Sequence, residues 1–361
     1  MRNSLFSYVR AKMLQKKKSP FHPFLHACSY FYRVAVWVRK ALYKKGIFPS
    51  FRASSFVISI GSPIAGGTGK TPLVLYLLRQ LDHTKCAVLL RGYRGTVEHT
   101  RISREVDALN PTLFGDEAVL IKKSAPNLLV LAGKRRKKSL QSADTQKKKL
   151  CILDDGFQHW SVQRDLDLVI LQESDLQEQQ WHLPRGFLRE SLRALARADL
   201  VFIEGTSSLA VLRTALLRYT KAPFVLVRRI LATPRLRTGV RCTGTICGVF
   251  CAIARPEPFL SGLQDLGWQV CYAKCFPDHS SFSREELEKI WRKSQALGAT
   301  VLLCTEKDFV KVPATWDIPI AYVPLAFQME GEELIWKLIP KEVCSPARAS
   351  EPHSPSMQTF L

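Results

Sequence analysis

The segment GSPIAGGTGKTP, residues 61–72, carries the glycines, lysine and threonine of a phosphate-binding loop and directly follows an apolar run, FVISI. The usual form of such a loop is Gly, any four residues, then Gly-Lys-Ser or Gly-Lys-Thr. Gly69, Lys70 and Thr71 fit this form, whereas Ile64 replaces its first glycine. Glycines inside the loop still free the backbone, so its amide groups can curl around phosphate oxygens. The residues predicted to bind a nucleotide triphosphate are Ile64, Ala65, Gly66, Gly67, Thr68, Gly69, Lys70 and Thr71.

Lys70 and Thr71 have distinct expected roles in this loop. The ammonium group of Lys70 is expected to reach the β- and γ-phosphate oxygens, and the Thr71 hydroxyl is expected to bind Mg²⁺. A helix that starts here, with Pro72 in its first turn, adds its positive end to the site. The alternative is a flexible glycine-rich turn in which Lys-Thr occurs by chance. The order strand, turn, helix argues against that alternative.

A metal-binding carboxylate is expected where a later strand ends, and the run LCILDDGFQH supplies Asp154 and Asp155. Either can hold Mg²⁺, directly or through water. Asp-Gly after a strand is also a common turn, so this signal gains its weight from the phosphate loop. The sequence does not distinguish which of the two aspartates touches the metal. Loop and carboxylates together predict ATP and Mg²⁺ as cofactors.

Short, nearly all-apolar runs recur along the chain, as expected for strands that are covered on both faces. They lie at 56–60, 86–90, 127–133, 150–155, 167–172, 199–205 and 223–229, and a second series lies at 245–254, 268–276, 300–308 and 318–325. Helical patterns lie between several of them, at 71–81, 189–198, 256–266 and 283–297. This alternation predicts an α/β fold with a P-loop NTPase-like, mostly parallel sheet flanked by helices, and a smaller C-terminal α/β domain.

Four parts are expected along the chain. They are a basic, aromatic N-terminal segment (1–50), a P-loop kinase core (51–235), a second α/β domain that completes the active-site cleft (236–340) and a disordered tail (341–361). The domain boundary is placed where the apolar pattern is lost, and the tail follows from its Ser/Pro-rich composition. The basic stretch at 134–149 is expected to be a solvated helix and loop, with attraction to phosphate or membrane as the alternative.

The net charge of +22 is concentrated at the N-terminus, where residues 1–50 hold eleven Lys or Arg and no Asp or Glu. Residues 21–38 are aromatic but too broken by polar positions for a clear membrane-spanning helix of ~20 apolar residues. The segment also lacks a signal-peptide cleavage site. We expect a helix that lies in the membrane interface with its basic residues on anionic headgroups. A helix that spans the bilayer, or one packed on the protein's own core, stays open.

The ten cysteines do not have the spacing of a metal site. Cys247 and Cys251, like Cys271 and Cys275, are separated by three residues rather than two, and no paired histidines follow. Without an export signal the expected compartment is the reducing cytosol. There the thiols are expected to be buried as small apolar groups.

The phosphate acceptor is indicated by the remaining motifs. The stretch TEKD, 305–308, superficially resembles the guanine-recognition motif Asn/Thr-Lys-x-Asp, but its lysine stands one position too late, which disfavours a GTPase. The other motifs, in chain order, are LLRGYRG (89–95), FGDEA (114–118), LDDGFQHWSVQRDLDLVI (153–170), LPRGFLRESL (183–192), FCAIARPEPF (250–259), FPDHSSFS (276–283) and CTEKDFVK (304–311). Together with AGGTGKTP they resemble the tetraacyldisaccharide 4'-kinase family, over roughly residues 20 to 340.

The resemblance implies an ATP-dependent kinase that transfers the γ-phosphate to the 4'-hydroxyl of a tetraacyldisaccharide 1-phosphate. The product is lipid IVA, in lipid A (lipopolysaccharide) biosynthesis. It also implies attachment through the N-terminal segment to the cytoplasmic face of the bacterial inner membrane, which agrees with the charge of residues 1–50. The expected partners are the lipid substrate and an anionic membrane surface, with no nucleic acid and no obligate protein partner.

The family pattern also implies site residues. Asp116 and His279 fall on the family's "GDE" aspartate and "DH" histidine, which are proposed to act as a pair. Asp116 is expected to accept the proton of the sugar hydroxyl, and His279 is expected to orient the Asp116 carboxylate. Lys70 is the third expected catalytic residue. Arg189, in "LRE", is expected to neutralise substrate charge. The expected metal ligands are Thr71, Glu117, Asp154, Asp155 and Glu190.

Without the family, Asp116 would be a turn or helix-cap residue and His279 a loop histidine, while the segment from Arg189 to Glu190 would start a solvated helix. The chain also departs from the family pattern at several positions. Arg185 and Phe187 replace the Ala and Pro of "LPAGPLRE", Ser62 replaces an Asn before the loop, and Ser280 stands where a second His is common. These changes leave the predicted nucleotide and base residues intact, and Arg185 is expected to add a charge for a lipid headgroup.

Two rival functions are compatible with a phosphate loop or a basic chain. A P-loop GTPase or partner-switching ATPase is disfavoured by the misplaced lysine of TEKD. A nucleic-acid-binding protein would mix basic residues with aromatic stacking platforms across the folded core. The main basic block is instead N-terminal and apolar, which favours lipid.

Overall fold

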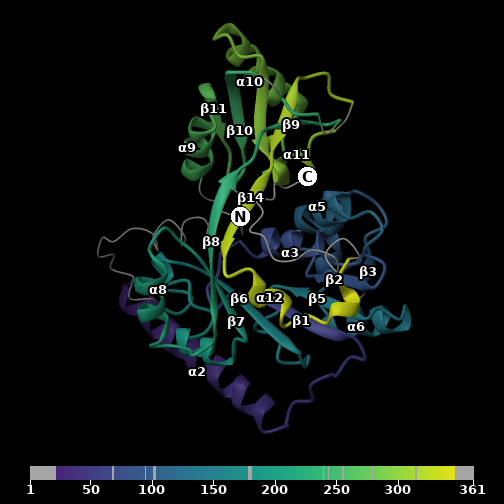
Figure 1. The fold of residues 1–361 in the computed structure, drawn as a ribbon, viewed down its shortest axis with the longest axis vertical. Coiled ribbons are helices and arrows are strands. Elements are labelled where there is room, and N and C mark those ends of the chain that lie inside the picture. Colours follow the sequence, from purple (N-terminus) through teal and green to yellow (C-terminus); the bar gives the residue numbers. More distant parts are fainter. Residues whose placement is uncertain are drawn as a thin grey trace.

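The structure is a computed structural model that describes residues 22–66, 69–93, 95–100, 103–177, 181–238, 240–242, 244–253, 256–277, 280–313 and 315–345. These residues form two sheets. Figure 1 shows the large sheet with its helices in the lower part of the molecule and the small sheet in the upper part.

Within the described residues the large sheet has nine strands in the order β14-β8-β7-β6-β1-β5-β2-β4-β3. Every neighbouring pair is parallel except the two at the edges, β14 with β8 and β3 with β4. The strands are β1 (Phe56–Gly61), β2 (Cys86–Leu90), β3 (Arg104–Glu105), β4 (Leu129–Ala132), β5 (Leu150–Asp154), β6 (Leu166–Gln172), β7 (Leu200–Glu204), β8 (Phe224–Leu231) and β14 (Leu325–Glu330). The predicted, mostly parallel sheet is confirmed. The pattern predicted it because strands with apolar side chains on both faces are stable only when helices cover both faces.

Helices cover both faces of this sheet. Ile58 and Ile60 of β1 pack in one apolar layer with Leu73 and Leu77 of α3, while Val57 faces the opposite layer with Leu140 of α6. This alternation is the period of two that a strand imposes on its side chains. The helices are α2 (His22–Lys44), α3 (Lys70–Leu78), α4 (Pro111–Phe114), α5 (Asp116–Ser124), α6 (Arg136–Thr145), α7 (Ser174–Gln177), α8 (Leu209–Leu216) and α12 (Glu333–Trp336), with the 3-10 helices η1 (Thr96–His99), η2 (Leu192–Arg197) and η3 (Lys341–Val343).

The small sheet has the strand order β11-β10-β12-β13-β9 in the described residues, parallel except for β9. Its strands are β9 (Arg235–Leu236), β10 (Ile246–Cys251), β11 (Gln269–Cys275), β12 (Val301–Thr305) and β13 (Ile320–Val323), and its helices are α9 (Glu257–Asp265), α10 (Arg284–Ala296) and α11 (Glu306–Phe309). Ser283 caps α10 through a capping box with Glu286, which fixes where that helix begins.

The two sheets are linked by β8 and β14, which pair antiparallel from the contact of Leu231 with Leu325 to that of Leu226 with Glu330. Both strands rise through the centre of the molecule in Figure 1. The prediction that 236–340 forms the second domain therefore needs correction, because β14 and α12 belong to the large sheet. The apolar run at 318–325 merged the end of β13 with the start of β14, so the sequence pattern hid the return of the chain.

Two further predictions are corrected by the structure. The tail was predicted to be disordered from residue 341, but Val343 is buried and its carbonyl accepts a hydrogen bond from the amide of Asp82 at 2.8 Å. Residues 346–361 of the predicted tail lie outside the described residues. The helical pattern at 189–198 gives the 3-10 helix η2 instead of an α-helix, because the preceding residues are held in a loop against the phosphate loop.

Helix α2 lies along the end of the large sheet that is farthest from the small sheet (Figure 1). One side is attached to the protein, since the buried Ser29 donates a hydrogen bond to the carbonyl of His182 at 2.8 Å. The other side exposes large aromatic residues, namely Phe24, Tyr30, Phe31 and Trp37. In the described part of the chain, no helix combines the length and the apolarity that a bilayer crossing needs.

Candidate active site

The predicted phosphate loop connects β1 to α3, the arrangement that the sequence indicated. Gly66 and Gly69 have positive φ angles of 127° and 85°, which L side chains rarely adopt. Gly69 turns the chain into α3, whose first residues are Lys70 and Thr71. Gly67 and Thr68, also predicted to bind nucleotide, lie outside the described residues. Among the described residues of the loop, Gly66 and Gly69 thus have the backbone conformations that favour glycine.

Ile64, at the position of the missing first glycine, has a structural explanation. Its side chain is buried in an apolar cluster with Phe157 and Leu188, and its backbone forms an antiparallel bridge with Leu188. The next amide, that of Ala65, donates to the carbonyl of Phe187 at 2.7 Å. The start of the loop is thus paired with the segment 187–188, where a side chain is accommodated and glycine is not required.

The loop and the end of β5 are brought together, as predicted. Lys70 Nζ lies 3.3 Å from the carbonyl oxygen of Gly66 and 3.6 Å from Asp155 Oδ1. The Thr71 hydroxyl lies 3.5 Å from Asp154 Oδ2. Asp155 has a positive φ of 55°, a strained conformation for a residue with a side chain. This turn directs the two adjacent carboxylates to different partners.

The two carboxylates differ in their ionisation. Burial, and next the nearby Glu117 and Asp155 carboxylates, raise the pKa of Asp154 to about 7. Burial also opposes ionisation of Asp155, but Lys70 and Arg189 outweigh it and lower the pKa of that carboxyl to about 2. Asp155 is therefore a charged anchor for the two cations, whereas Asp154 lies in surroundings that favour an added positive charge.

The residues around Asp154 fit a magnesium ion. Its Oδ1 is buried and has no hydrogen-bond partner among the described residues, and oxygen ligands are those that Mg²⁺ prefers. No three His, Cys, Asp or Glu side chains of the described residues form a complete metal cage. Magnesium that binds with a nucleotide commonly uses only one or two carboxylates together with phosphate oxygens.

Arg189, expected from the family motif to neutralise substrate charge, lies beside the phosphate loop. Its guanidinium Nη1 lies 2.7 Å from each carboxylate oxygen of Asp155, and its amide donates to the carbonyl of Pro63 at 2.7 Å. Glu190 is instead buried against Arg197, with which both its oxygens pair at 2.7 and 3.0 Å. The alternative of a solvated helix start is wrong for this segment. A metal-binding role for Glu190 stays a prediction and would require competition with Arg197.

Two arginines near the site were missed by the sequence analysis. Arg136 was expected on a solvated helix, but it is buried and donates to the carbonyls of Gly133 and Asp154 at 2.6 and 3.1 Å. Burial lowers its pKa to about 10, so it stays charged at neutral pH. Arg229 of β8 lies against the loop, because a Cβ added to Gly69 would come within 2.7 Å of its guanidinium. The one sequence feature that could have indicated a site role for Arg136 is its position shortly after the apolar run 127–133.

Asp116 is the first residue of α5 and stands on a turn that is locked by close packing. A Cβ added to Gly115 would meet the carbonyl oxygen of Tyr93 at 2.5 Å, and Gly115 has a φ of 87°. The motifs LLRGYRG and FGDEA, separate in the sequence, therefore form one packed unit. Asp116 and Glu117 both lie in the first turn of α5, where the positive end of the helix favours carboxylates.

Asp116 faces the small sheet. Its Oδ2 lies 3.4 Å from Lys311 Nζ, and the same ammonium group donates to the carbonyl of Ser280 at 3.1 Å. His279, predicted to pair with Asp116, lies outside the described residues. Ser280, its neighbour in the chain, thus reaches the group that contacts Asp116.

The TEKD motif is explained by helix capping. The Thr305 side chain accepts a hydrogen bond from the amide of Asp308 at 3.2 Å at the start of α11, as an N-cap residue does. The fully buried Asp308 accepts from the amide of Ala252 at 2.9 Å. This geometry agrees with the rejection of a guanine-recognition motif.

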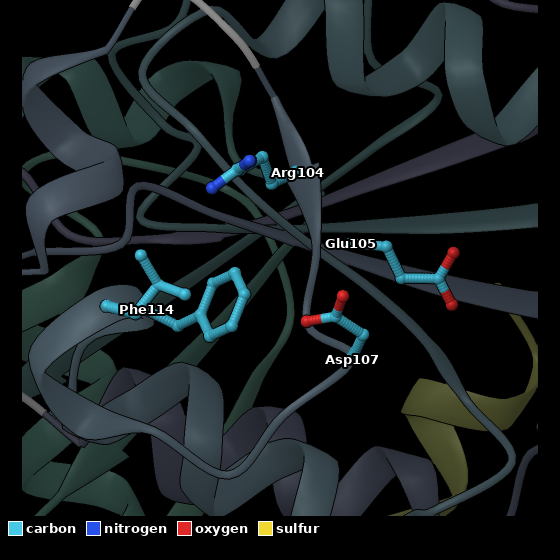
Figure 2. A pocket seen from close by; sticks show the side chains of 5 residues that line it. Arg104, Glu105, Asp107 and Phe114 are labelled. Atoms are coloured by element: carbon cyan, nitrogen blue, oxygen red, sulfur yellow. The ribbon is translucent and has the colours of Figure 1, made fainter.

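A pocket of about 230 Å³ is lined in part by α4, the helix that precedes Asp116. Figure 2 shows its labelled side chains, with Arg104 and Glu105 on β3, Asp107 just beyond it, and Phe114 on α4. Helix α4 leads directly into the turn that carries Asp116. The pocket therefore adjoins the predicted base but contains none of the predicted site residues.

Comparisons with known proteins cover nearly the whole described chain. A sequence model of the tetraacyldisaccharide-1-P 4'-kinase family (LpxK) matches residues 21–343. A tetraacyldisaccharide 4'-kinase of Anaeromyxobacter dehalogenans is 36% identical over 299 residues, 78% of this chain and 78% of that protein. One from Chlorobium limicola is 30% identical over 354 residues, 91% of this chain and 99% of the relative. The crystal structure of LpxK from Aquifex aeolicus in complex with ATP is similar with a TM-score of 0.68 at 26% identity, covering 89% of this chain and 98% of that one.

Proposed function

The chain belongs to the tetraacyldisaccharide-1-P 4'-kinase family, and from this premise we propose how its residues perform the reaction. The phosphate donor is ATP and the acceptor is the 4'-hydroxyl of a tetraacyldisaccharide 1-phosphate, which becomes lipid IVA in lipid A biosynthesis. The observation that carries the proposal is the convergence of Lys70, Thr71 and Arg189 on the two carboxylates at the end of β5.

The phosphate loop binds the triphosphate. Amide groups of the loop surround the phosphate oxygens, and Lys70 and Arg189 supply positive charge where negative charge spreads during transfer. Both cations now contact Asp155. A triphosphate brings more negative charge than one carboxylate, so it competes for the same two side chains. The ion pairs with Asp155 thereby hold both cations in place before ATP arrives.

The Thr71 hydroxyl and the Asp154 carboxylate are the groups that would hold Mg²⁺, with Glu117 and Asp155 alongside. Bound there, the ion would neutralise charge on the phosphate oxygens. The fit rests on the Oδ1 of Asp154, which has no hydrogen-bond partner among the described residues, and on the raised pKa of this carboxyl, which burial and next the nearby Glu117 and Asp155 cause.

Asp116 accepts the proton of the 4'-hydroxyl. The sugar oxygen then bonds to the γ-phosphorus while the bond from that phosphorus to the bridging oxygen of ADP breaks, and ADP leaves with the electron pair. His279 is proposed to orient Asp116, as the family resemblance implies. Asp116 lies on the first turn of a helix fixed by the Gly115 turn, which supports its role as a positioned base.

Helix α2 is proposed to bind the cytoplasmic face of the bacterial inner membrane and so to present the lipid substrate to the site. Its exposed aromatic side suits the headgroup region, and Arg33 and Arg39 on the same helix suit anionic lipids. The contact of Ser29 with His182 connects this helix to the segment that pairs with the phosphate loop. Arg185 packs 3.6 Å over the ring of Trp181 and contacts His26 of α2 at 2.7 Å, which places a cation near the proposed membrane side.

The reaction is tested with the purified chain, γ-labelled ATP and a tetraacyldisaccharide 1-phosphate in detergent micelles. The proposal predicts label in the lipid, dependent on Mg²⁺, and loss of transfer in Lys70→Ala. Lys138→Ala, at an exposed lysine of α6, is the matched control and should transfer at the wild-type rate. Label released only as inorganic phosphate, with none in the lipid, would contradict the proposal.

Membrane attachment is tested by sedimentation with vesicles of anionic phospholipid. Replacing Phe31 and Trp37 together by Ala should weaken vesicle association by about tenfold or more, because two large apolar side chains leave the interface. Leu297→Ala, at an exposed apolar residue beside α10, is the control. Equal sedimentation of all three proteins would contradict attachment through α2.

A further inference from the structure

Lys311 lies where the small sheet meets the large one. It follows α11, and α11 packs against α5, the helix that begins with the proposed base. Figure 1 shows α11 directly above α5, at the junction of the two regions. The Lys311 side chain is only 7% exposed, although lysine is among the residues least often buried. Burial of an ammonium group is costly unless it is paired, so its partners identify what it does.

The Lys311 ammonium group makes two hydrogen bonds and one further ion pair with oxygen atoms of other residues. These are Asp308 Oδ1 at 3.0 Å, the Ser280 carbonyl at 3.1 Å and Asp116 Oδ2 at 3.4 Å. The Phe282 ring lies 5.4 Å from the same nitrogen. An ammonium group has three donors, and the two hydrogen bonds together with the ion pair to Asp116 fix its position.

The three oxygen atoms that contact Lys311 come from three separate segments. Asp308 is fully buried and is itself fixed by the Ala252 amide at 2.9 Å and the Thr305 hydroxyl at 2.8 Å. It therefore holds Lys311 as part of the small sheet. Asp308 already balances the charge of Lys311, so neutralisation alone does not require the contact with Asp116 in the large sheet.

We propose that Lys311 is a positioning residue for the phosphoryl transfer. It holds the Asp116 carboxylate and the chain at Ser280, next to His279, in a fixed relation, so that the base is in place only when the small sheet is packed on α5. A carboxylate has about four acceptor positions, so the ion pair with Lys311 does not by itself prevent Asp116 from accepting the hydroxyl proton. The inference rests on the proposed role of Asp116.

The test is a double-mutant cycle in the full-length chain, with Lys311→Met, Asp116→Asn and the double variant, measured by transfer of label to the lipid. Lys311→Met should lower kcat by about 30-fold, because a misplaced reacting group costs roughly this much. The KM for ATP should change by less than about twofold, since the contacts of Lys311 with Asp308, Ser280, Asp116 and Phe282 include none with the described residues of the phosphate loop. In the Asp116→Asn background the same substitution should change kcat by less than about twofold.

Two controls separate positioning from folding. Lys289→Met, at an exposed lysine of α10, should have wild-type kcat. Lys311→Arg keeps the charge, and its kcat should lie between those of the wild type and Lys311→Met. If Lys311→Met does not fold, Lys311→Arg carries the test, and a wild-type kcat for it overturns the proposal.

Other outcomes discriminate between the two proposals. An equal loss from Lys311→Met in both backgrounds overturns the positioning role while the base assignment stands. Wild-type kcat in Asp116→Asn removes the base assignment and the positioning role with it. A kcat above wild type in Lys311→Met also overturns the proposal, because the contact would then be a brake.

Discussion

Lys70 contacts its own loop and the end of a strand in the same sheet, whereas Asp116 is held by Lys311, a residue that belongs to the other sheet. The phosphate half of the site consists of the loop with Asp154, Asp155 and Arg189, and it is thus assembled from the large sheet and the segments that pack on it. The acceptor half, Asp116 with Lys311 and Ser280, depends on how two sheets pack. The donor half therefore makes its contacts within the large sheet and its helices, while the carboxylate of the proposed base also contacts a residue of the small-sheet region.

Lys70→Ala, in the phosphate half, is expected to have the largest effect. We expect a fall in kcat on the order of 10³-fold, because a cation aimed at the transferred phosphate is lost from a preorganised site. Thermal unfolding should be nearly unchanged, since Arg189 still pairs with Asp155. Label transfer and a melting curve measure the two quantities. A loss of stability that matches the loss of activity would contradict the assignment of Lys70 to the phosphate half.

Arg189→Lys tests whether the geometry of the guanidinium matters in the same half. We expect kcat to fall by about 10²-fold, because lysine keeps the charge but not the planar arrangement of donors. The matched control is Arg193→Lys, at an exposed arginine of η2, which should transfer at the wild-type rate. If Arg189→Lys does the same, charge alone is sufficient at this position.

Gly115→Ala tests the acceptor half through its backbone. The added Cβ would clash with the Tyr93 carbonyl at 2.5 Å and would force an L side chain to a φ of 87°. We expect a loss of about 2–3 kcal/mol in unfolding free energy and a fall in kcat, with the KM for ATP unchanged. Gly46→Ala is the control, because Gly46 has a φ of 73° but nothing within 4 Å of the added Cβ. It should lose only about 1 kcal/mol.

Glu306→Gln tests how the stability of the region around α11, which packs against α5, depends on pH. Burial raises the pKa of Glu306 in α11 from 4.5 to about 7. The folded state therefore keeps a proton that the unfolded state loses, so stability is full below about pH 4.5 and falls as the pH rises toward 7. The variant has no such loss, and its unfolding free energy should exceed that of the wild type by on the order of 2 kcal/mol at pH 8 but not at pH 4.5. Denaturant unfolding at both pH values measures this; equal stability at pH 8 would contradict it.

The fold was largely predictable because its strands are buried on both faces. The runs at 56–60 and 86–90 correspond closely to β1 and β2, since a covered parallel strand must be continuously apolar. The phosphate loop was predictable for a similar local reason. Its glycines, lysine and threonine act within a few residues of one another, and the carboxylates lie at the end of the adjacent strand, β5.

What the sequence missed depends on contacts between distant segments. Arg136 is in a run of basic residues that suggests solvent, and only the fold shows it buried under Asp154. Lys311 is the last residue of the motif CTEKDFVK, but its contacts with Asp116 and Ser280 join residues far apart in the chain. The return of β14 to the large sheet was hidden because β14 pairs with the distant β8, while its start merges with β13 in one apolar run.

The central claim is that both halves act on one phosphate. It is tested most directly by a crystal structure of the chain with Mg²⁺, a non-hydrolysable ATP analogue and the disaccharide acceptor. The account predicts the 4'-oxygen about 3.5 Å from the γ-phosphorus and within about 3 Å of an Asp116 carboxylate oxygen, with Lys70 on the γ-phosphate. A γ-phosphate bound at Lys70 with Asp116 more than about 8 Å from the acceptor oxygen would contradict it, because no direct proton transfer spans that distance.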